Sequence, residues 1–466
     1  MKRGNSLDIL DGSSTYLGGL LETLTRRGRL LLRRNPQPQP QAEQIDLVAL
    51  AETLLSRRGE ASGVALAREL LSAYQWAPIE SKLVFLLALA DRFGPEQRQL
   101  ELAMEALRRE RTADNLDAIH VASEPRRQQL FRRLNLAPGG TKALIRMRED
   151  LLQQLGQKPE LRGVDSDFAH LFGSWFNRGF LVLRPIDWTS PANILERIIQ
   201  YEAVHEIRDW DDLRNRLQPS DRRCYAFFHP QLVDEPLIFV EVALTKEIPS
   251  QIHPLLDLDR TVIKDSEATT AVFYSISNTQ KGLRGVSFGN FLIKQVVENL
   301  KAELPNLKTF VTLSPVPGFA TWLAKERNSP NSAFADPAFA DKLKLLDGPD
   351  WHQNDDVVAE VRPALQAATA YYFLRAKNPK GRPVDPVAQF HLGNGARLEQ
   401  INFLGDRSPK GLKQSHGMMV NYLYQLNEIE ANHEAFAENG NVAASPAVRK
   451  LLPTNLQSRE LTVQRG

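Results

Sequence analysis

The chain has 466 residues, which is too many for one ordinary hydrophobic core, so we expect at least two domains. Hydrophobic residues make up 42% of the chain, enough for globular packing. The net charge is +2, from 58 basic and 56 acidic residues, so the chain lacks the excess of basic residues that is typical of a nucleic-acid-binding protein. The single cysteine, Cys224, excludes an intrachain disulfide and a cysteine-based zinc site and fits a reducing compartment. Its apolar neighbours predict a buried thiol.

The sequence shows no membrane span and no recognisable targeting segment. The longest apolar run, Leu83 to Ala90, is far shorter than the roughly 20 residues that a span requires. The N-terminus, MKRGNSLDIL, lacks the apolar centre of a secretion signal. Asp8, Asp11 and Glu22 argue against a transit peptide. We therefore expect a cytoplasmic protein with no membrane partner.

The N-terminal part of the chain has a helical pattern. Residues 1–41 predict a basic helix followed by the spacer NPQPQPQ, which cannot hold a helix. From 42 to 180, apolar residues recur three and four positions apart, and strand-like alternation is nearly absent. Breaks fall at Gly94-Pro95 and at Pro138-Gly139-Gly140. We expect an all-α helical bundle domain that serves self-association or support.

The remainder, 181–466, alternates strands and helices. The runs CYAFFH, LIFVEVAL and AVFYSI, which begin at Cys224, are predicted strands. Later elements are a helix ending near Arg375 with Pro363 in its first turn, a strand from Arg397 to Phe403, and a final helix from about Ser415 through Tyr424. The predicted fold class is α+β, with an all-α domain followed by an α/β domain.

One stretch of this second domain predicts an anion-binding loop. A strand at 271–276 leads into a glycine-rich turn, then a helix, then a second strand that stops at Ser314-Pro315. Glycines let backbone N–H groups approach a phosphate, and the helix N-terminus adds partial positive charge. The spacing fits neither a P-loop nor G-x-G-x-x-G. An ordinary turn at a helix start is the alternative.

This loop resembles the coenzyme A loop of the GNAT acyltransferase superfamily, whose pattern is Arg/Gln-x-x-Gly-x-Gly/Ala before a helix. Ser287 stands where the pattern has its middle glycine. The resemblance assigns coenzyme binding to Arg284, Gly285, Val286, Ser287, Phe288, Gly289 and Asn290.

Four segments together resemble the malonyl-CoA decarboxylase family. They are FYSISNTQKGLRGVSFGNFLIKQVV, LSPVPGF, NPKGRPVDPVAQFHLGNGARLEQINFLGD and SHGMMVNYLY. The resemblance implies an enzyme that cleaves malonyl-CoA to acetyl-CoA and carbon dioxide without a metal, biotin or other prosthetic group. It also implies a catalytic domain of the GNAT fold and a helical domain that forms a homo-oligomer, either a dimer or a tetramer.

The resemblance further implies three catalytic residues. They are Ser314 in LSPVPGF, His391 in FHLGNGA, and Tyr424 on the expected C-terminal helix. The chemistry suits them, because decarboxylation produces an enolate that needs a hydrogen-bond donor and then a proton. Without the resemblance, Ser314 is an ordinary turn serine and His391 a packed histidine at a strand start.

Two other functions stay open at this point. An N-acyltransferase would need an amine acceptor groove, and a non-catalytic acyl-CoA scaffold would bind without turnover. Three further histidines, His229, His253 and His416, compete with His391 but lie in no matching motif. The sequence contains no H-x-x-x-H or H-E-x-x-H spacing, so no metal site is expected.

Overall fold

The computed structural model describes residues 45–56, 59–286, 292–330, 332–334 and 336–453. The expected N-terminal helix and spacer at 1–41 therefore lie outside the described residues. The chain separates into two compact units. The first comprises Met1–Phe180 together with two short later segments, His229–Val233 and Gln280–Phe288. All other residues belong to the second unit.

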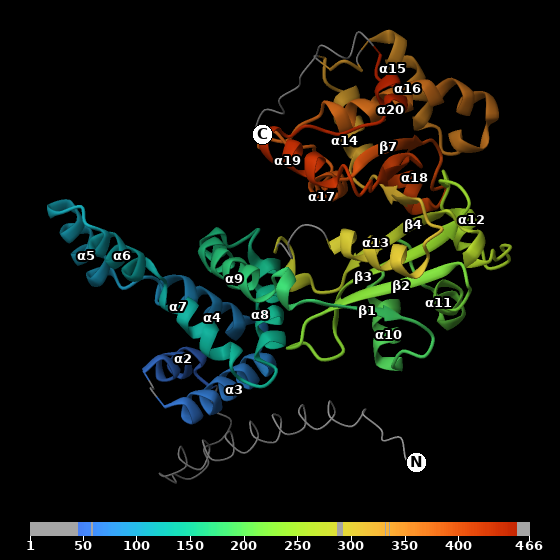
Figure 1. The fold of residues 1–466 in the computed structure, drawn as a ribbon. Helices are drawn as coiled ribbons and strands as arrows, with labels where there is room; N and C mark the ends of the chain where they lie inside the picture. Colours follow the sequence, from blue (N-terminus) through green and yellow to red (C-terminus); the bar gives the residue numbers. More distant parts are fainter. Residues whose placement is uncertain (1–44, 57–58, 287–291, 331, 335, 454–466) are drawn as a thin grey trace, which may run out of the picture. The chain divides into compact units, whose positions relative to one another are not determined.

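The first unit is helical, as the sequence predicts. Its helices are α2 Leu47–Ser56, α3 Glu60–Trp76, α4 Ile79–Asp91, α5 Gln97–Arg109, α6 Ala113–Ser123, α7 Arg126–Asn135, α8 Gly140–Gln154 and α9 Arg162–Trp175 (Figure 1). Leucines three and four apart bury one face of each inner helix, for example Leu66, Leu70 and Leu71 of α3. The glycines at 139–140 permit the turn into α8, since Gly139 has a φ of +73°.

The helices α5 and α6 form a hairpin that projects from the rest of this unit (Figure 1). Apart from Ala103 in α5, no residue of either helix is buried. Leu102, Met104, Leu116 and Val121 are all exposed, with Val121 at 74%. The hairpin therefore exposes several large apolar side chains to solvent, and exposed apolar surface of this kind often marks an interaction site.

The segment 280–286 attaches to α8 by close backbone packing at Gly282. A side chain at Gly282 would overlap the carbonyl oxygen of Ile145. Arg148 of α8 donates from Nη1 to the carbonyl oxygen of Gly282 at 2.8 Å and from Nε to Asp165 at 2.8 Å. Glycine at 282 therefore lets the start of the loop lie directly on α8.

The second unit is built on an eight-stranded mixed sheet among the described residues, in the order β1-β2-β3-β4-β5-β8-β6, with β7 paired to β8. Its strands are β1 Val182–Ile186, β2 Arg222–Phe228, β3 Pro236–Thr245, β4 Thr270–Asn278, β5 Thr309–Thr312, β6 Ser314–Pro315, β7 Arg397–Asn402 and β8 Met419–Leu423. The described pairs are antiparallel except β4 and β5, which α13 connects. The predicted α+β class is thus confirmed.

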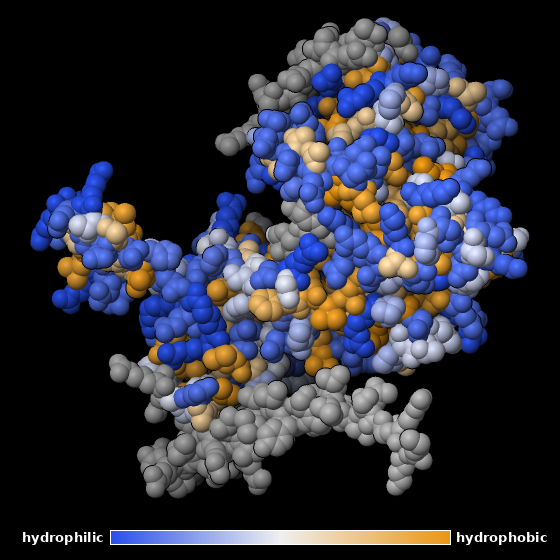
Figure 2. Space-filling model, viewed as in Figure 1, coloured by the Kyte–Doolittle hydropathy of each residue, from blue (hydrophilic) through white to orange (hydrophobic). Residues whose placement is uncertain are grey.

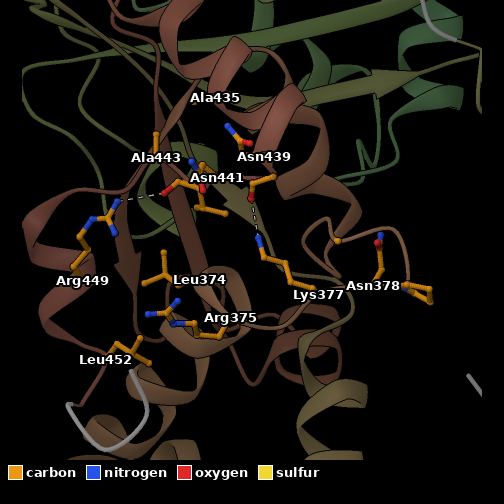
Figure 3. A pocket seen from close by; sticks show the side chains of 14 residues that line it. Leu374, Arg375, Lys377, Asn378, Ala435, Asn439, Asn441, Ala443, Arg449 and Leu452 are labelled. Atoms are coloured by element: carbon orange, nitrogen blue, oxygen red, sulfur yellow. Dashed lines mark hydrogen bonds between the residues drawn. The ribbon is translucent and has the colours of Figure 1, made fainter. Parts of the chain in front are cut away.

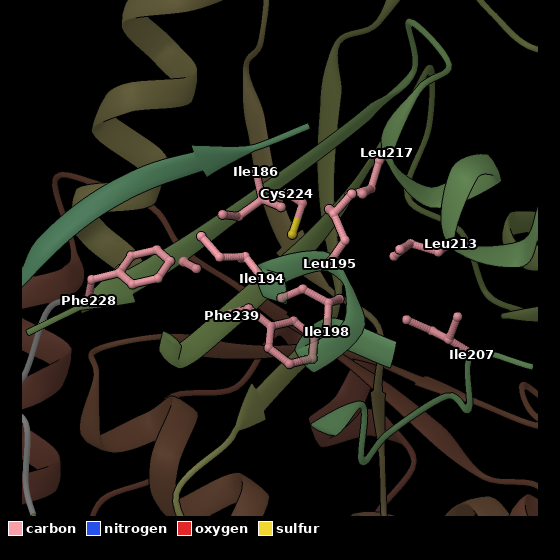
Figure 4. Close-up of a cluster of buried hydrophobic side chains, with 11 residues drawn as sticks. Ile186, Ile194, Leu195, Ile198, Ile207, Leu213, Leu217, Cys224, Phe228 and Phe239 are labelled. Atoms are coloured by element: carbon pink, nitrogen blue, oxygen red, sulfur yellow. The ribbon is translucent and has the colours of Figure 1, made fainter. Parts of the chain in front are cut away.

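Helices cover both faces of this sheet (Figure 1). They are α10 Ala192–Tyr201, α11 Trp210–Leu217, α12 His253–Leu256, α13 Leu292–Glu303, α14 Phe319–Arg327, α15 Pro337–Lys344, α16 Asp355–Leu374, α17 Pro386–Gly393, α18 Pro409–Ser415, α19 Ile429–Asn439 and α20 Pro446–Lys450. The face toward α10 and α11 carries an apolar cluster around Cys224 and Phe239 (Figure 4). The prediction of a buried thiol is therefore correct.

Strand alternation divides the central strands between two environments. Val311, Leu313 and Met419 belong to a second apolar cluster, which also contains Val272 and Tyr274 of β4. Because side chains alternate along a strand, Thr312 and Ser314 point to the opposite face. Tyr422 of β8 shares that opposite face. Figure 1 shows α13 on the side of the sheet away from α10 and α11.

Two element predictions are wrong. The expected final helix from Ser415 through Tyr424 is the strand β8, so Tyr424 follows a strand. All of Met419, Val420 and Tyr422 are buried, so the polar-apolar alternation that normally reveals a strand is missing. Pro363 lies inside α16, not in its first turn. Its ring is exposed, and the buried residues after it hold the helix together.

None of the described helices is long and apolar enough to cross a membrane.

Replacing Gly282 by alanine tests the packing of the loop start on α8. We expect Gly282→Ala to lower the free energy of unfolding by about 1–3 kcal/mol, because the new methyl group must displace backbone. Gly63→Ala is the matched control, since that helical position has open space around it and alanine favours a helix. Urea unfolding followed by circular dichroism measures both. Equal stability of Gly282→Ala and the wild type would contradict the described packing.

Candidate active site

Ser314 lies where β5 ends and the two-residue strand β6 begins. It pairs with Val420 of β8, and its side chain is 5% exposed. Its Oγ donates a hydrogen bond to Oγ1 of Thr312 at 2.8 Å, and the same Oγ1 accepts from the backbone N–H of Tyr422 at 3.1 Å. The hydroxyl of Ser314 is thus held by neighbours on the same face of two paired strands.

His391 is carried by α17, which the sequence analysis did not predict as a helix. Asp385 caps its start by accepting from the N–H of Ala388 at 2.7 Å, and Pro386 takes the first helical position. The helix ends at Gly393, and Gly395 has a φ of +79° in a place where a side chain would overlap the carbonyl of Ile429. The expectation that His391 lies at a strand start is wrong.

The structure brings three predicted catalytic residues into one contact chain. Nε2 of His391 lies 3.3 Å from Oγ of Ser314, and Nδ1 lies 2.8 Å from the hydroxyl of Tyr424. The imidazole also stacks on the ring of Tyr422, with a centroid separation of 4.6 Å. All three side chains are buried. Residues separated by 110 positions along the chain therefore form one polar cluster inside the second unit.

Burial decides the charge of this cluster. Loss of water lowers the pKa of His391 to about 3, so the imidazole is neutral at pH 7. Burial raises the pKa of Tyr424 above its ordinary value, so the phenol keeps its proton. If the phenol donates to Nδ1, Nε2 carries the imidazole hydrogen and donates to Ser314, which in turn donates to Thr312. Each hydroxyl and the imidazole then donate one hydrogen bond along the chain from Tyr424 to Thr312. In this arrangement Ser314 donates to Thr312 and accepts from the imidazole, so His391 does not act as a base toward it.

The predicted coenzyme loop is described only in part. Arg284 ends the 3-10 turn Lys281–Leu283, Gly285 has a φ of +77°, and Val286 is buried. These three residues belong to the helical unit, although the sequence analysis assigned them to the domain from 181 onward. Ser287, Phe288, Gly289 and Asn290 lie outside the described residues. The positive φ at Gly285 shows why the loop needs glycine there.

The strands β4 and β5 pair over only part of their length. Their register runs from Thr270 opposite Thr309 to Phe273 opposite Thr312, and β4 then continues to Asn278. Phe273, at the end of the paired segment, contacts the ring of Tyr424. The cluster therefore lies where the two parallel strands separate, which is the edge of an α/β sheet where ligands usually bind.

Sequence reasoning missed two members of the cluster, Thr312 and Tyr422. Each lies two residues before a predicted catalytic residue, in Thr312-Leu313-Ser314 and Tyr422-Leu423-Tyr424. A period of two along a strand puts both members of each pair on one face. The period of two could have pointed to Thr312, because the sequence predicts a strand that ends at Ser314. It could not point to Tyr422, because the sequence predicts a helix where β8 lies.

The competing histidines make other contacts. Nε2 of His229 lies 3.0 Å from the carbonyl oxygen of Trp175, inside the helical unit. His253 begins α12, and His416 closes α18 in a left-handed conformation with a φ of +51°. Among the described residues, no group of three or more His, Cys, Asp or Glu side chains could hold a metal ion.

Comparisons with known proteins place most of the chain beside one family. The model of the malonyl-CoA decarboxylase C-terminal domain matches residues 179–462, and that of the N-terminal domain matches residues 93–176. The crystal structure of malonyl-CoA decarboxylase from Rhodopseudomonas palustris is 63% identical, with a TM-score of 0.85, and covers 88% of this chain and 100% of its own. The corresponding structure from Agrobacterium vitis is 58% identical, with a TM-score of 0.84 and the same coverage.

A curated animal relative is also similar. The mitochondrial malonyl-CoA decarboxylase of Anser anser anser is 36% identical over 369 residues, which are 74% of this chain and 73% of that protein. These matches define the chain as a decarboxylase, a lyase that breaks a carbon–carbon bond to release a carboxyl group. Within that class, the chain belongs to the malonyl-CoA decarboxylase family.

The buried neutral imidazole makes a prediction about pH. The folded pKa of His391 lies below the unfolded value, so the unfolded chain binds the proton more readily and stability falls as pH drops below about 6.5 toward 3. We expect this residue to contribute a slope of up to about 1.4 kcal/mol per pH unit in that window. Urea unfolding of the wild type and His391→Gln at pH 7, 5.5 and 4.5 measures it.

The same slope in both proteins would show that His391 is not desolvated as described. His253→Gln is the control, because His253 is exposed at the start of α12 and its replacement leaves the buried cluster intact.

Proposed function

We propose that this protein converts malonyl-CoA to acetyl-CoA and carbon dioxide at the cluster of Ser314, His391 and Tyr424. The observation that carries the proposal is the buried contact chain from Tyr424 through His391 to Ser314, at the point where β4 and β5 separate. Malonyl-CoA decarboxylation is the activity for which the matched family is named.

The reaction needs an electron sink, and the substrate provides one. The bond between the malonyl Cα and its carboxylate breaks, and its electron pair moves into the thioester to give an enolate. Carbon dioxide leaves, and the carbon then takes up one proton to give the acetyl group. Because the thioester carbonyl accepts the electrons, we expect no metal, biotin or other cofactor.

The protein contributes a dry site and directed hydrogen-bond donors. The carboxylate loses hydration on entering the buried cluster, and this favours release of neutral carbon dioxide. We assign Ser314 and the Nε2–H of His391 to the malonyl carbonyl, whose oxygen gains negative charge as the enolate forms. Tyr424 keeps the imidazole in the tautomer that has its hydrogen on Nε2.

Delivery of the proton follows from the same charges. The empty cluster holds His391 neutral because burial lowers its pKa. A malonyl carboxylate, or the enolate that replaces it, favours the protonated imidazole and so raises that pKa. We therefore assign His391 as the group that returns a proton to the enolate carbon.

The coenzyme is assigned to the loop from Arg284 to Asn290. The support is the positive φ of Gly285, the arginine before it, and the helix α13 that follows. Backbone N–H groups at a helix N-terminus favour phosphate binding.

A cytoplasmic location stays a prediction.

We also infer that the protein is a homo-oligomer, and we assign the contact to the α5/α6 hairpin. Figure 2 shows apolar side chains on this projecting part of the helical unit. The hairpin exposes four large apolar side chains, at 102, 104, 116 and 121. A second copy of the same surface would cover them without needing any other partner.

Turnover of the purified protein tests the reaction. Incubation with malonyl-CoA should yield acetyl-CoA and carbon dioxide in equal amounts, without an added amine and in the presence of a metal chelator. Consumption of acetyl-CoA that depends on an added amine would indicate an acyltransferase instead. Tight binding of malonyl-CoA without product would indicate a scaffold.

Replacing the site residues separates chemistry from binding. We expect Ser314→Ala and His391→Ala each to lower kcat by about 10²-fold or more, because each removes a donor to the developing oxyanion. Binding of free coenzyme A should change less than threefold. Ser275→Ala is the matched control, since this buried serine on β4 bonds to Glu202, away from the cluster. Undiminished turnover in both site variants would refute the assigned site.

Replacing exposed residues of the hairpin tests the oligomer. We expect Leu116→Glu combined with Val121→Glu to reduce the mass measured by light scattering after size exclusion, because the charges oppose burial of that surface. Val262→Glu is the control, as Val262 is exposed in the other unit. A mass unchanged by the hairpin variant would exclude this contact.

A further inference from the structure

A second concave region lies in the sheet unit, among residues that the cluster of Ser314, His391 and Tyr424 does not use. It has a volume of about 880 Å³ and is lined by the end of α16, the loop after it, the end of α19 and the segment that leads through α20 (Figure 3). This volume falls within the range of pockets that hold small organic ligands. The pocket is therefore large enough for more than an inorganic ion.

The lining of this pocket is positively charged. Three lining residues are basic, Arg375 and Lys377 just beyond the end of α16 and Arg449 in α20, and none of the described lining residues is acidic (Figure 3). The loop adds further charge, because the sequence RAKNPKGR at 375–382 contains four basic residues and no acidic one. A concentration of one sign of charge in a concave site attracts ligands of the opposite sign.

Basic residues also occur at helix C-termini for a structural reason, and two helices end at this pocket. Lys377 meets that need, since its Nζ donates to the carbonyl oxygen of Gly440 just beyond α19 at 2.9 Å. Arg449 similarly donates to the carbonyl oxygens of Ala444 and Val442, at 3.3 and 3.4 Å. These two contacts orient the side chains and hold the walls of the pocket together.

Arg375 is different. Its Nε is buried and has no hydrogen-bond partner, and its side chain makes no ion pair with any residue that the structure describes. A buried donor without an acceptor costs about 1–3 kcal/mol, so such groups usually have a partner. A guanidinium that faces a cation-lined pocket without a carboxylate has a natural partner in a ligand anion.

The two loops of the pocket are held in place before any ligand binds. Asn378 accepts with Oδ1 from the N–H groups of Lys380 and Arg382, which fixes the first loop. Gly440 has a φ of +64°, and a side chain there would approach the carbonyl oxygen of Gly381 to 2.8 Å. The first loop and the turn after α19 thus touch through glycines, so the basic groups are preorganised.

We propose that this pocket binds a small organic phosphate, with Arg375 as the residue that contacts the phosphoryl oxygens. The guanidinium forms paired hydrogen bonds to phosphate, and Arg449 supplies a second cation from the opposite segment. A phosphoryl group fills only part of this volume. The remaining space, which the side-chain amides of Asn439 and Asn441 help to line, fits the polar organic part of such a ligand. The phosphate has two possible sources, the coenzyme portion of an acyl-CoA or a separate phosphorylated metabolite.

Titration with inorganic pyrophosphate tests the proposal. Calorimetry on the full-length protein in a chloride buffer should show saturable binding, which Arg375→Gln weakens by about tenfold or more. Because Arg375 is partly buried, Arg449→Gln at the exposed wall provides a second variant and should weaken binding in the same direction. Arg407→Gln is the matched control, since Arg407 is exposed and does not line the pocket.

The source of the phosphate is read from competition and kinetics. If the pocket takes the coenzyme's phosphates, pyrophosphate competes with malonyl-CoA and Arg375→Gln raises KM with little change in kcat. If it takes a separate metabolite, Arg375→Gln leaves KM for malonyl-CoA unchanged, and malonyl-CoA does not displace the part of the pyrophosphate binding that Arg375→Gln weakens. Both results support an organic phosphate site. Absence of saturable binding, or equal affinity in the wild type and in both pocket variants, would overturn the proposal.

Discussion

Removal of water from His391 is the constraint on which the rest of the candidate active site depends. The ring stacks on Tyr422 and lies between the hydroxyls of Ser314 and Tyr424, so solvent does not reach it. In water the same imidazole would be partly protonated near neutral pH, and the direction of its hydrogen bonds would not be fixed. Burial makes it neutral, and a hydrogen bond donated by the phenol of Tyr424 to Nδ1 would place the ring hydrogen on Nε2.

Two buried polar clusters, one on each face of the sheet, differ in their charge. On the face toward α10 and α11, Arg216 bonds to Asp212 and Glu241 at 3.1 and 3.2 Å, deep in the core. On the other face, the described cluster consists of hydroxyl, phenol and imidazole groups that carry no formal charge near pH 7. Under the assignment proposed above, a substrate carboxylate would meet hydrogen-bond donors in this cluster and no group that is positively charged before the substrate binds.

Much of the fold follows from local patterns in the sequence, and the exceptions have specific physical causes. The strand–loop–helix–strand unit from β4 to β5 is visible in the sequence because a buried strand, glycines and an amphipathic helix each leave a distinct pattern. The strand β8 is not, because both of its faces are buried, with Met419 on one side and Tyr422 on the other. The helix α17 is only eight residues long, so its cap at Asp385 and its glycine end were its strongest signals. The contact between Ser314 and His391 joins residues 77 positions apart, and local patterns carry no such distance information.

The attachment of the glycine loop to α8 has a consequence for the architecture of the enzyme. The segment that leads from β4 toward α13 belongs to the helical unit, and it is fixed there by Gly282 against Ile145 and by Arg148. The helical unit is therefore the framework that holds the backbone at 280–286 in place. A shortened chain that lacked the bundle would have to support this stretch of backbone by some other means.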